Sequence, residues 1–169
     1  MIKDITGLKY GNLTVTGVNK PGTNGRLWEL KCICGDFCYT TSSDLERGRR
    51  NFCKNCKKLK SIKSGINIFY KEYIRNAKNR KYDFTLTFED FEILIFQNCN
   101  YCDIEPLNKS KSTMSYIFKY NGIDRKDNSK GYSLENCVTC CKYCNIAKKD
   151  NDMEDFIQWI NHLKSINCK

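Results

Sequence analysis

The chain has 169 residues, of which 40% are hydrophobic, and it carries a formal net charge of +10. This length suits one or two small domains, and the apolar fraction supports only a modest core. We expect no membrane association, because the longest apolar cluster, Phe91 to Phe96, is interrupted by Glu92 and is too short to span a bilayer.

Twelve cysteines indicate how so small a chain is stabilised. The N-terminal residues Met1 to Thr6 form no apolar signal segment, so we expect an intracellular, cytoplasmic protein. Cysteine pairs at two-residue spacing in such a protein are more often zinc ligands than disulfides. We therefore predict a protein that is held together by zinc.

The first part of the chain has the pattern of a small β-rich module. Apolar and polar residues alternate from Ile5 to Val18, which predicts strand structure, with turns at Gly7, Gly11 and Gly17. Pro21-Gly22 and Asn24-Gly25 predict a hairpin connection, and a second strand is expected to begin at Leu27. Two cysteine pairs follow and predict a tetrahedral zinc site made of Cys32, Cys34, Cys53 and Cys56. Cys38 is an alternative ligand.

The positive charge is concentrated in one central segment. Residues Arg47 to Lys81 contain thirteen Lys or Arg and one acid, Glu72, whereas the rest of the chain has sixteen basic and eighteen acidic residues. Such a block can neutralise the phosphates of nucleic acid, although a solvated helix face is the simpler alternative. The residues predicted to contact nucleic acid are Arg47, Arg49, Arg50, Lys71, Arg75, Lys78, Arg80 and Lys81.

Three helices are predicted after a basic linker at 59–65. The first begins at Ile66, with Phe69, Tyr73 and Ala77 on one face. The second spans Phe88 to Gln97 and follows Thr87, which forms a capping-box pattern with Asp90. Asp152 is expected to cap the third, whose apolar stripe predicts core positions at Met153, Phe156, Ile157, Ile160 and Leu163.

A second set of cysteine pairs lies in the second half of the chain. Two Cys-x-x-Cys motifs about forty residues apart predict one structural zinc bound by Cys99, Cys102, Cys141 and Cys144. The remaining Cys137, Cys140 and Cys168 are predicted to be packing residues or free thiols.

Residues 66–165 resemble the zinc-stabilised HNH endonucleases of the ββα-metal type. The matching positions are Asp124 at the end of a strand, Asn136 after the Gly131-Tyr132 turn, and Asn145 directly after the last zinc cysteine. The resemblance implies that Asp124 and Asn145 hold one Mg2+ or Mn2+ against the scissile phosphate, and that Asn136 holds the loop and the base in place. Residues 1–58 resemble a cysteine-rich module that precedes nuclease or DNA-binding domains in phage proteins.

The ligand types support two kinds of metal independently of the resemblance. Phosphodiester cleavage needs an activated nucleophile and a cation that stabilises charge on the phosphate. Hard oxygen ligands such as Asp124 and Asn145 suit Mg2+ or Mn2+, whereas the soft thiolates suit zinc.

The chain departs from the family at one position. Members usually have Asp-His where this chain has Asp124-Arg125, and arginine is always protonated and cannot act as a general base. The single histidine, His162, lies in the last predicted helix. Some members carry Asp-Arg and place a tyrosine near the phosphate. This resemblance implies that Arg125 stabilises phosphate charge and that a tyrosine or a metal-bound water supplies the nucleophile. Tyr101 is the first candidate for that tyrosine, and Tyr82 and Tyr132 are the others.

The sequence therefore predicts an α+β protein with a zinc module at 1–58, a linker at 59–65 and an HNH-like nuclease domain at 66–169. The leading prediction is a phage-type or mobile-element DNA endonuclease that acts on duplex DNA, as a homodimer if both strands are cut. A catalytically silent DNA-binding zinc protein is the first alternative. An RNA-binding or RNA-cleaving zinc protein is the second.

Overall fold

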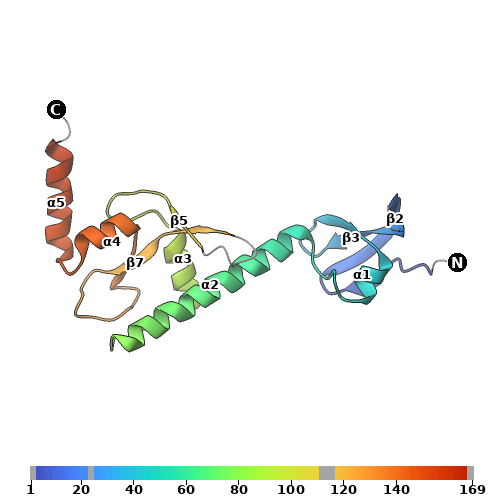
Figure 1. Ribbon diagram of the computed structural model, residues 1–169, viewed down its shortest axis with the longest axis horizontal. Coiled ribbons are helices and arrows are strands. Elements are labelled where there is room, and N and C mark those ends of the chain that lie inside the picture. Colours follow the sequence, from blue (N-terminus) through green and yellow to red (C-terminus); the bar gives the residue numbers. More distant parts are fainter. Residues whose placement is uncertain (1–2, 23–24, 111–116, 167–169) are drawn as a thin grey trace. The chain divides into compact units, whose positions relative to one another are not determined.

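The computed structural model describes residues 3–22, 25–110 and 117–166 and contains two compact units, Met1–Ser61 and Ile62–Lys169. Its mixture of helices and antiparallel strands confirms the α+β class (Figure 1). That residues 1–58 and 66–169 fold as independent domains remains a prediction.

The first unit is built on a four-stranded antiparallel sheet. Its strands are β1 (Lys9–Tyr10), β2 (Leu13–Gly22), β3 (Gly25–Cys32) and β4 (Phe37–Thr40), in spatial order β1-β2-β3-β4. The short helix α1 (Ser42–Glu46) follows. The predicted turn position Gly11 adopts a φ of +58° and turns the chain between β1 and β2.

The expected hairpin connects β2 to β3, whose register runs to Gly22 opposite Gly25. Asn24, part of the predicted turn, lies outside the described residues. The second strand begins at Gly25 instead of Leu27, because pairing continues to the end of the hairpin. Leu13, Val15, Trp28 and Leu30 form the buried core between the sheet and α1.

The long helix α2 (Lys54–Asn79) corrects the prediction of a linker followed by a helix from Ile66. Residues 59–65 are helical, since Lys, Leu and Ile are compatible with a helix and the segment contains no proline. Their polarity reflects exposure to water, as in the solvent-facing side of any amphipathic helix. The predicted apolar face is confirmed, because Ile66 and Ala77 are buried and Phe69 and Tyr73 pack against the same core.

Helix α3 (Phe88–Phe96) begins at the predicted capping box: Thr87 and Asp90 exchange the two expected hydrogen bonds. Phe91, Leu94 and Ile95 of α3 pack between α2 and the strand β7 (Gly122–Arg125). A small pair, β5 (Asn108–Lys109) and β6 (Lys119–Tyr120), precedes β7. This core supports one side of the strand-strand-helix segment that follows.

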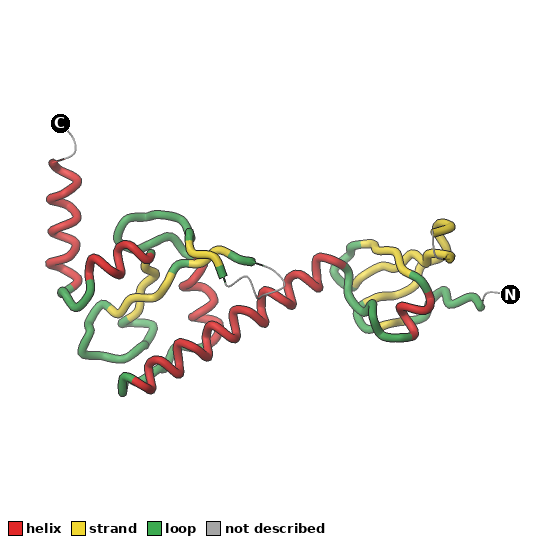
Figure 2. The backbone as a smooth tube through the Cα atoms, viewed as in Figure 1, coloured by secondary structure: helices red, strands yellow, loops and turns green. Residues whose placement is uncertain are grey.

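That segment consists of β7, the antiparallel strand β8 (Cys137–Cys140) and helix α4 (Lys142–Lys148), as Figure 2 shows. Asp124 pairs with Val138 in the register, which places the predicted acidic residue near the end of β7. The sequence prediction of two strands followed by a helix is confirmed.

The last helix, α5 (Met153–Ile166), starts directly after Asp152, whose carboxylate accepts a hydrogen bond from the Glu154 N–H. Phe156 is buried, and Met153, Ile157 and Ile160 pack partly against the second cysteine cluster. The predicted core position Leu163 is wrong, since this side chain is 39% exposed on the outer part of the helix. No described helix is long and apolar enough to cross a membrane.

Candidate active site and zinc clusters

Each half of the chain holds one group of four cysteine sulfurs. Cys32, Cys34, Cys53 and Cys56 form the first group, and their sulfur atoms all lie within 4.8 Å of one another. Sulfurs from opposite pairs are adjacent, with 3.5 Å between Cys34 and Cys53. Four thiolates at this spacing could hold a zinc ion. Cys38 is not a member of the group, so the first choice of ligands agrees with the geometry.

The second group, Cys99, Cys102, Cys141 and Cys144, joins the loop after α3 to the start of α4. The Cys141 sulfur caps α4 by accepting a hydrogen bond from the Cys144 N–H. Burial raises the pKa of the Cys99 thiol, but hydrogen bonds from backbone groups of Cys141 and Cys102 outweigh this effect and lower the pKa to about 7. A thiol that loses its proton near neutral pH suits metal binding.

The leftover cysteines divide as follows. Cys137 and Cys140 are buried, outside the sulfur clusters, and burial raises the pKa of the Cys137 thiol to about 12. They are packing residues. Cys168 lies outside the described residues.

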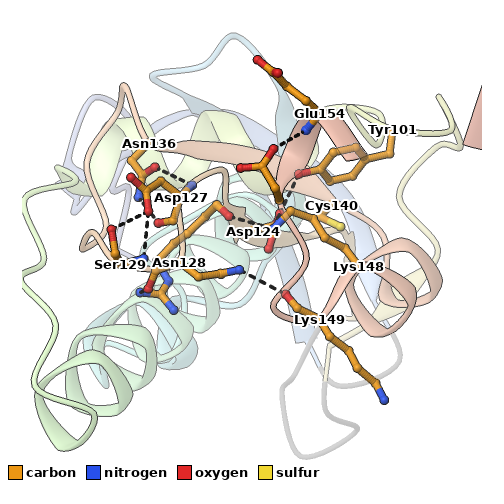
Figure 3. A network of polar contacts seen from close by, with 12 residues as sticks. Tyr101, Asp124, Asp127, Asn128, Ser129, Asn136, Cys140, Lys148, Lys149 and Glu154 are labelled. Carbon is orange, nitrogen blue, oxygen red and sulfur yellow. Dashed lines mark hydrogen bonds and ion pairs between the residues drawn. The ribbon is translucent and has the colours of Figure 1, made fainter. Parts of the chain in front are cut away.

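Asp124 is the centre of a buried polar network. Its side chain is 6% exposed, and the Tyr101 hydroxyl donates a hydrogen bond of 2.6 Å to its Oδ2. The Lys148 ammonium lies 3.2 Å from the same oxygen and also donates to the Arg125 backbone carbonyl. Figure 3 shows Tyr101 and Lys148 converging on Asp124. Since both contacts fall on Oδ2, Oδ1 receives no hydrogen bond from the described residues and is left for a ligand.

A cavity of about 670 Å³ lies beside this network. Asp124 and Asn145 both line it, together with Arg125, Asn128, Lys149 and Asp150. Asn145 is exposed in α4, and the hydrogen bonds of its backbone hold that helix. The potential metal ligands at this cavity are carboxylate and amide oxygens, which suit a hard divalent cation better than zinc. The two predicted oxygen ligands are therefore brought to one cavity.

Arg125 lines the cavity but is also fixed by the structure around it. Its Nη1 donates to the carbonyl oxygens of Asn128 and Lys130, at 3.1 and 2.7 Å. The guanidinium lies 3.7 Å from the centre of the Tyr82 ring and 5.3 Å from that of Tyr132. It thus supplies a rigidly held positive charge without being able to accept a proton.

Asn136 closes the loop between β7 and β8. Its Oδ1 accepts a hydrogen bond from the Asp127 N–H, and its Nδ2 donates to the carbonyls of Asp127 and Gly131. These contacts are those of a residue that holds the loop. Gly131 is needed beside it, because a Cβ there would lie 2.3 Å from the Asp83 carbonyl. Asn136 does not line the cavity.

The geometry separates the three candidate tyrosines. Tyr82 and Tyr132 flank Arg125, and Tyr132 also accepts a hydrogen bond from Arg80. Burial, followed by the hydrogen bond to Asp124, raises the pKa of Tyr101 well above its ordinary value. A phenol that stays protonated and donates to Asp124 orients this carboxylate more readily than it attacks a phosphate.

Replacing Tyr101 with phenylalanine tests this distinction. If the nuclease predicted from the sequence is correct, cleavage should fall by about 10–100-fold, as for loss of an outer partner of a metal ligand. The apparent Mg2+ affinity, read from the metal dependence of the rate, should weaken in parallel. Tyr82→Phe, which leaves Asp124 untouched, is the matched control. Complete loss of cleavage in Tyr101→Phe with unchanged metal dependence would instead indicate a direct chemical role for the hydroxyl.

The sequence pattern predicts no role for Lys148. A lysine in the last turn of a short helix is normally a solvated residue that interacts with the helix dipole, yet this one is completely buried. The signal that could have found it is spacing: Lys148 lies one helical turn after Cys144 and Asn145, on the side of α4 that faces β7. Its charge compensates that of Asp124 within the protein.

Replacing Lys148 with methionine should lower the free energy of unfolding by about 3 kcal/mol, because the Asp124 carboxylate would remain buried without a cation. The shift of the chemical denaturation midpoint of the zinc-loaded protein measures this. Lys142→Met, at an exposed position of the same helix, should have almost no effect. Equal stability of both variants would show that the buried ion pair contributes nothing.

The predicted nucleic-acid residues lie mainly at the surface. Seven are exposed and Arg50 is half-buried; they are Arg47, Arg49, Arg50, Lys71, Arg75, Lys78, Arg80 and Lys81. Arg80 also lines the cavity beside Asp124. His162 is exposed on α5 and does not line that cavity.

Comparison with known proteins gives limited similarity. No family model matches the chain. The chain is 43% identical over 88 residues to the uncharacterized protein R423 of Acanthamoeba polyphaga mimivirus, a match that covers 52% of this chain and 15% of that protein. A solved structure of the rare-cutting HNH restriction endonuclease PacI is 20% identical and covers 80% of this chain and 94% of that one, with a TM-score of 0.45. At that TM-score the likeness carries no argument about mechanism.

Proposed function

We propose that the chain is a divalent-metal-dependent endonuclease that hydrolyses phosphodiester bonds in duplex DNA. The observation that carries the proposal is the joint position of Asp124 and Asn145 on one cavity, with Oδ2 of Asp124 held from behind by Tyr101 and Lys148. This arrangement leaves Oδ1 and the Asn145 amide as oxygen ligands. A buried ion pair of this kind is commonly no more stabilising than apolar packing of the same volume, so its presence beside a cavity supports a functional role.

Each residue has a role that follows from its contacts. Asp124 and Asn145 would hold Mg2+ or Mn2+, which when bound stabilises negative charge on the phosphate. Arg125, fixed between two aromatic rings and two carbonyls, would place its free N–H groups toward the phosphate. Asn136 keeps the loop that supplies those carbonyls in place.

Hydrolysis adds water across a phosphorus–oxygen bond, so the proton of the attacking water needs an acceptor. Arg125 cannot serve. Among the described residues, two carboxylates other than Asp124 line the cavity, Asp150 and Glu72, and Glu72 already pairs with Arg75. Asp150 is therefore the acceptor that we propose. The basic surface residues and the net charge of +10 favour a polyanionic substrate.

A second candidate is a DNA-binding protein without activity. It is favoured by the ion pair between Lys148 and Asp124, because a buried ammonium already neutralises the carboxylate that should attract the metal. In this case Arg125 would bind phosphate without any catalytic role, as expected for the inactive DNA-binding protein that the sequence left as the first alternative.

The experiment that tests the proposal compares labelled duplex DNA, single-stranded DNA and RNA of one sequence, each incubated with zinc-loaded protein and Mg2+. Cleavage of the duplex is expected. Preferred cleavage of RNA would support the RNA alternative. Salt-sensitive binding of all substrates without any cleavage, also with Mn2+ and on a long mixed-sequence DNA, would favour the inactive DNA-binding protein.

A further inference from the structure

The first unit contains a basic hollow that is separate from the Asp124 cavity. Its volume is about 420 Å³, and it lies between α1, the loop after it and the first turns of α2. It is lined by four cations, one aromatic residue, one acid and one amide residue: Arg49, Arg50, Lys57, Lys60, Phe52, Asp44 and Asn51. We call it the Phe52 hollow.

Local structure forces these cations together. Cys53 is buried in the first sulfur group, so the chain on either side of it is fixed by the cluster. Asn51, two residues before Cys53, packs against the β1–β2 turn. Its backbone carbonyl accepts a hydrogen bond from the Asn12 N–H. A Cβ at Gly11 would lie 2.8 Å from the Asn51 Cβ, so this close approach requires glycine. The loop that carries Arg49 and Arg50 is thereby fixed, and it lines the hollow together with Lys57 and Lys60 of α2.

Most of the cations that line the hollow form no ion pair with a carboxylate of the described residues. Asp44 lies 3.8 Å from Arg49. Within the part of the chain that the structure describes, no carboxylate forms an ion pair with Arg50, Lys57 or Lys60. The Lys60 ammonium lies 4.6 Å from the centre of the Phe52 ring, which holds this cation at the rim. Like charges at such density destabilise the free protein and favour binding of an anion.

We propose that the Phe52 hollow binds a backbone phosphate of nucleic acid. Arginine and lysine groups from a loop and from a helix that line one hollow match the several oxygen acceptors of a phosphodiester. The choice of nucleic acid over free phosphate rests on the proposed function. The zinc-binding unit thus has a phosphate contact of its own, distinct from the one at Asp124.

The test is a double charge reversal, Arg50→Glu with Lys57→Glu, in the full-length zinc-loaded protein. Duplex DNA affinity is measured by fluorescence anisotropy over a range of salt concentrations without Mg2+, so that cleavage does not interfere. We expect binding to weaken by at least about 10-fold and the slope of log affinity against log salt to fall by about two. The control, Lys3→Glu with Lys9→Glu, has the same net charge and changes exposed residues of the same unit outside the hollow.

Equal loss in both double variants would overturn the proposal, because only the overall charge would then matter. Zinc content and circular dichroism establish whether the variants are folded. If the charge-reversed variant does not fold, Arg50→Gln with Lys57→Gln replaces it as the milder pair. If inorganic phosphate bound at the hollow but did not compete with DNA, the assignment to nucleic acid would be overturned. Since binding is read without cleavage, the outcome stands even if the protein proves to be no nuclease.

Discussion

Replacing Asp124 with asparagine is expected to lower DNA cleavage about 1000-fold while leaving zinc content and DNA affinity unchanged. The loss follows from the removal of a charged ligand whose cation stabilises the phosphate in the transition state, a contribution of several kcal/mol. The measurement is the initial rate of cleavage at saturating DNA and Mg2+.

Asparagine is a better probe here than alanine. Its amide oxygen can still accept hydrogen bonds from Tyr101 and Lys148, whereas alanine would leave the fully buried Lys148 ammonium without its acid partner. Loss of activity in Asp124→Ala alone could therefore reflect instability. A rate within about 10-fold of wild type for Asp124→Asn would show that the carboxylate charge is not required.

Loss of the second sulfur group is expected to unfold the strand-strand-helix segment. Structural zinc contributes about 10–16 kcal/mol to small zinc-bound folds, comparable with the whole stability of a domain. Cys99→Ser should therefore reduce bound zinc from two ions to one per chain and abolish cooperative thermal unfolding of the second unit. Zinc analysis and calorimetry measure both effects.

Two controls make the zinc experiment specific. Cys140→Ser changes a buried sulfur next to the group but outside it, and should keep both zinc ions. Cys53→Ser should remove zinc from the first unit only. If Cys99→Ser retained two zinc ions per chain, the assignment of the second group as a zinc site would be wrong.

Local signals predicted the elements that local chemistry determines. The capping box at Thr87 and the apolar face of α2 follow from spacing within one helix, and both are present. The cysteine pairs gave both sulfur groups, because their short spacing leaves few other arrangements. The start of α2 was missed since a basic, polar stretch has no apolar stripe that would distinguish a solvated helix from a linker.

The candidate site was predictable only in part, because some of its contacts are tertiary. Asp124 and Asn145 stand at positions that the strand-strand-helix order brings together, and they share a cavity. The burial of Lys148 and the carbonyl contacts of Arg125 depend on how α4 and the loop fold onto β7. Such tertiary contacts have no pattern in the sequence, and they change Tyr101 from a candidate nucleophile into a residue that orients Asp124.

The most direct measurement of the central claim is cleavage of supercoiled plasmid by zinc-loaded protein, with Mg2+ or Mn2+ and in a metal-free control, alongside Asp124→Asn and Asn145→Ala. A divalent cation held by Asp124 and Asn145 predicts nicking or linearisation that requires the added metal and is lost or strongly reduced in both variants. Cleavage that persists without added metal, or in Asp124→Asn at the wild-type rate, would contradict it.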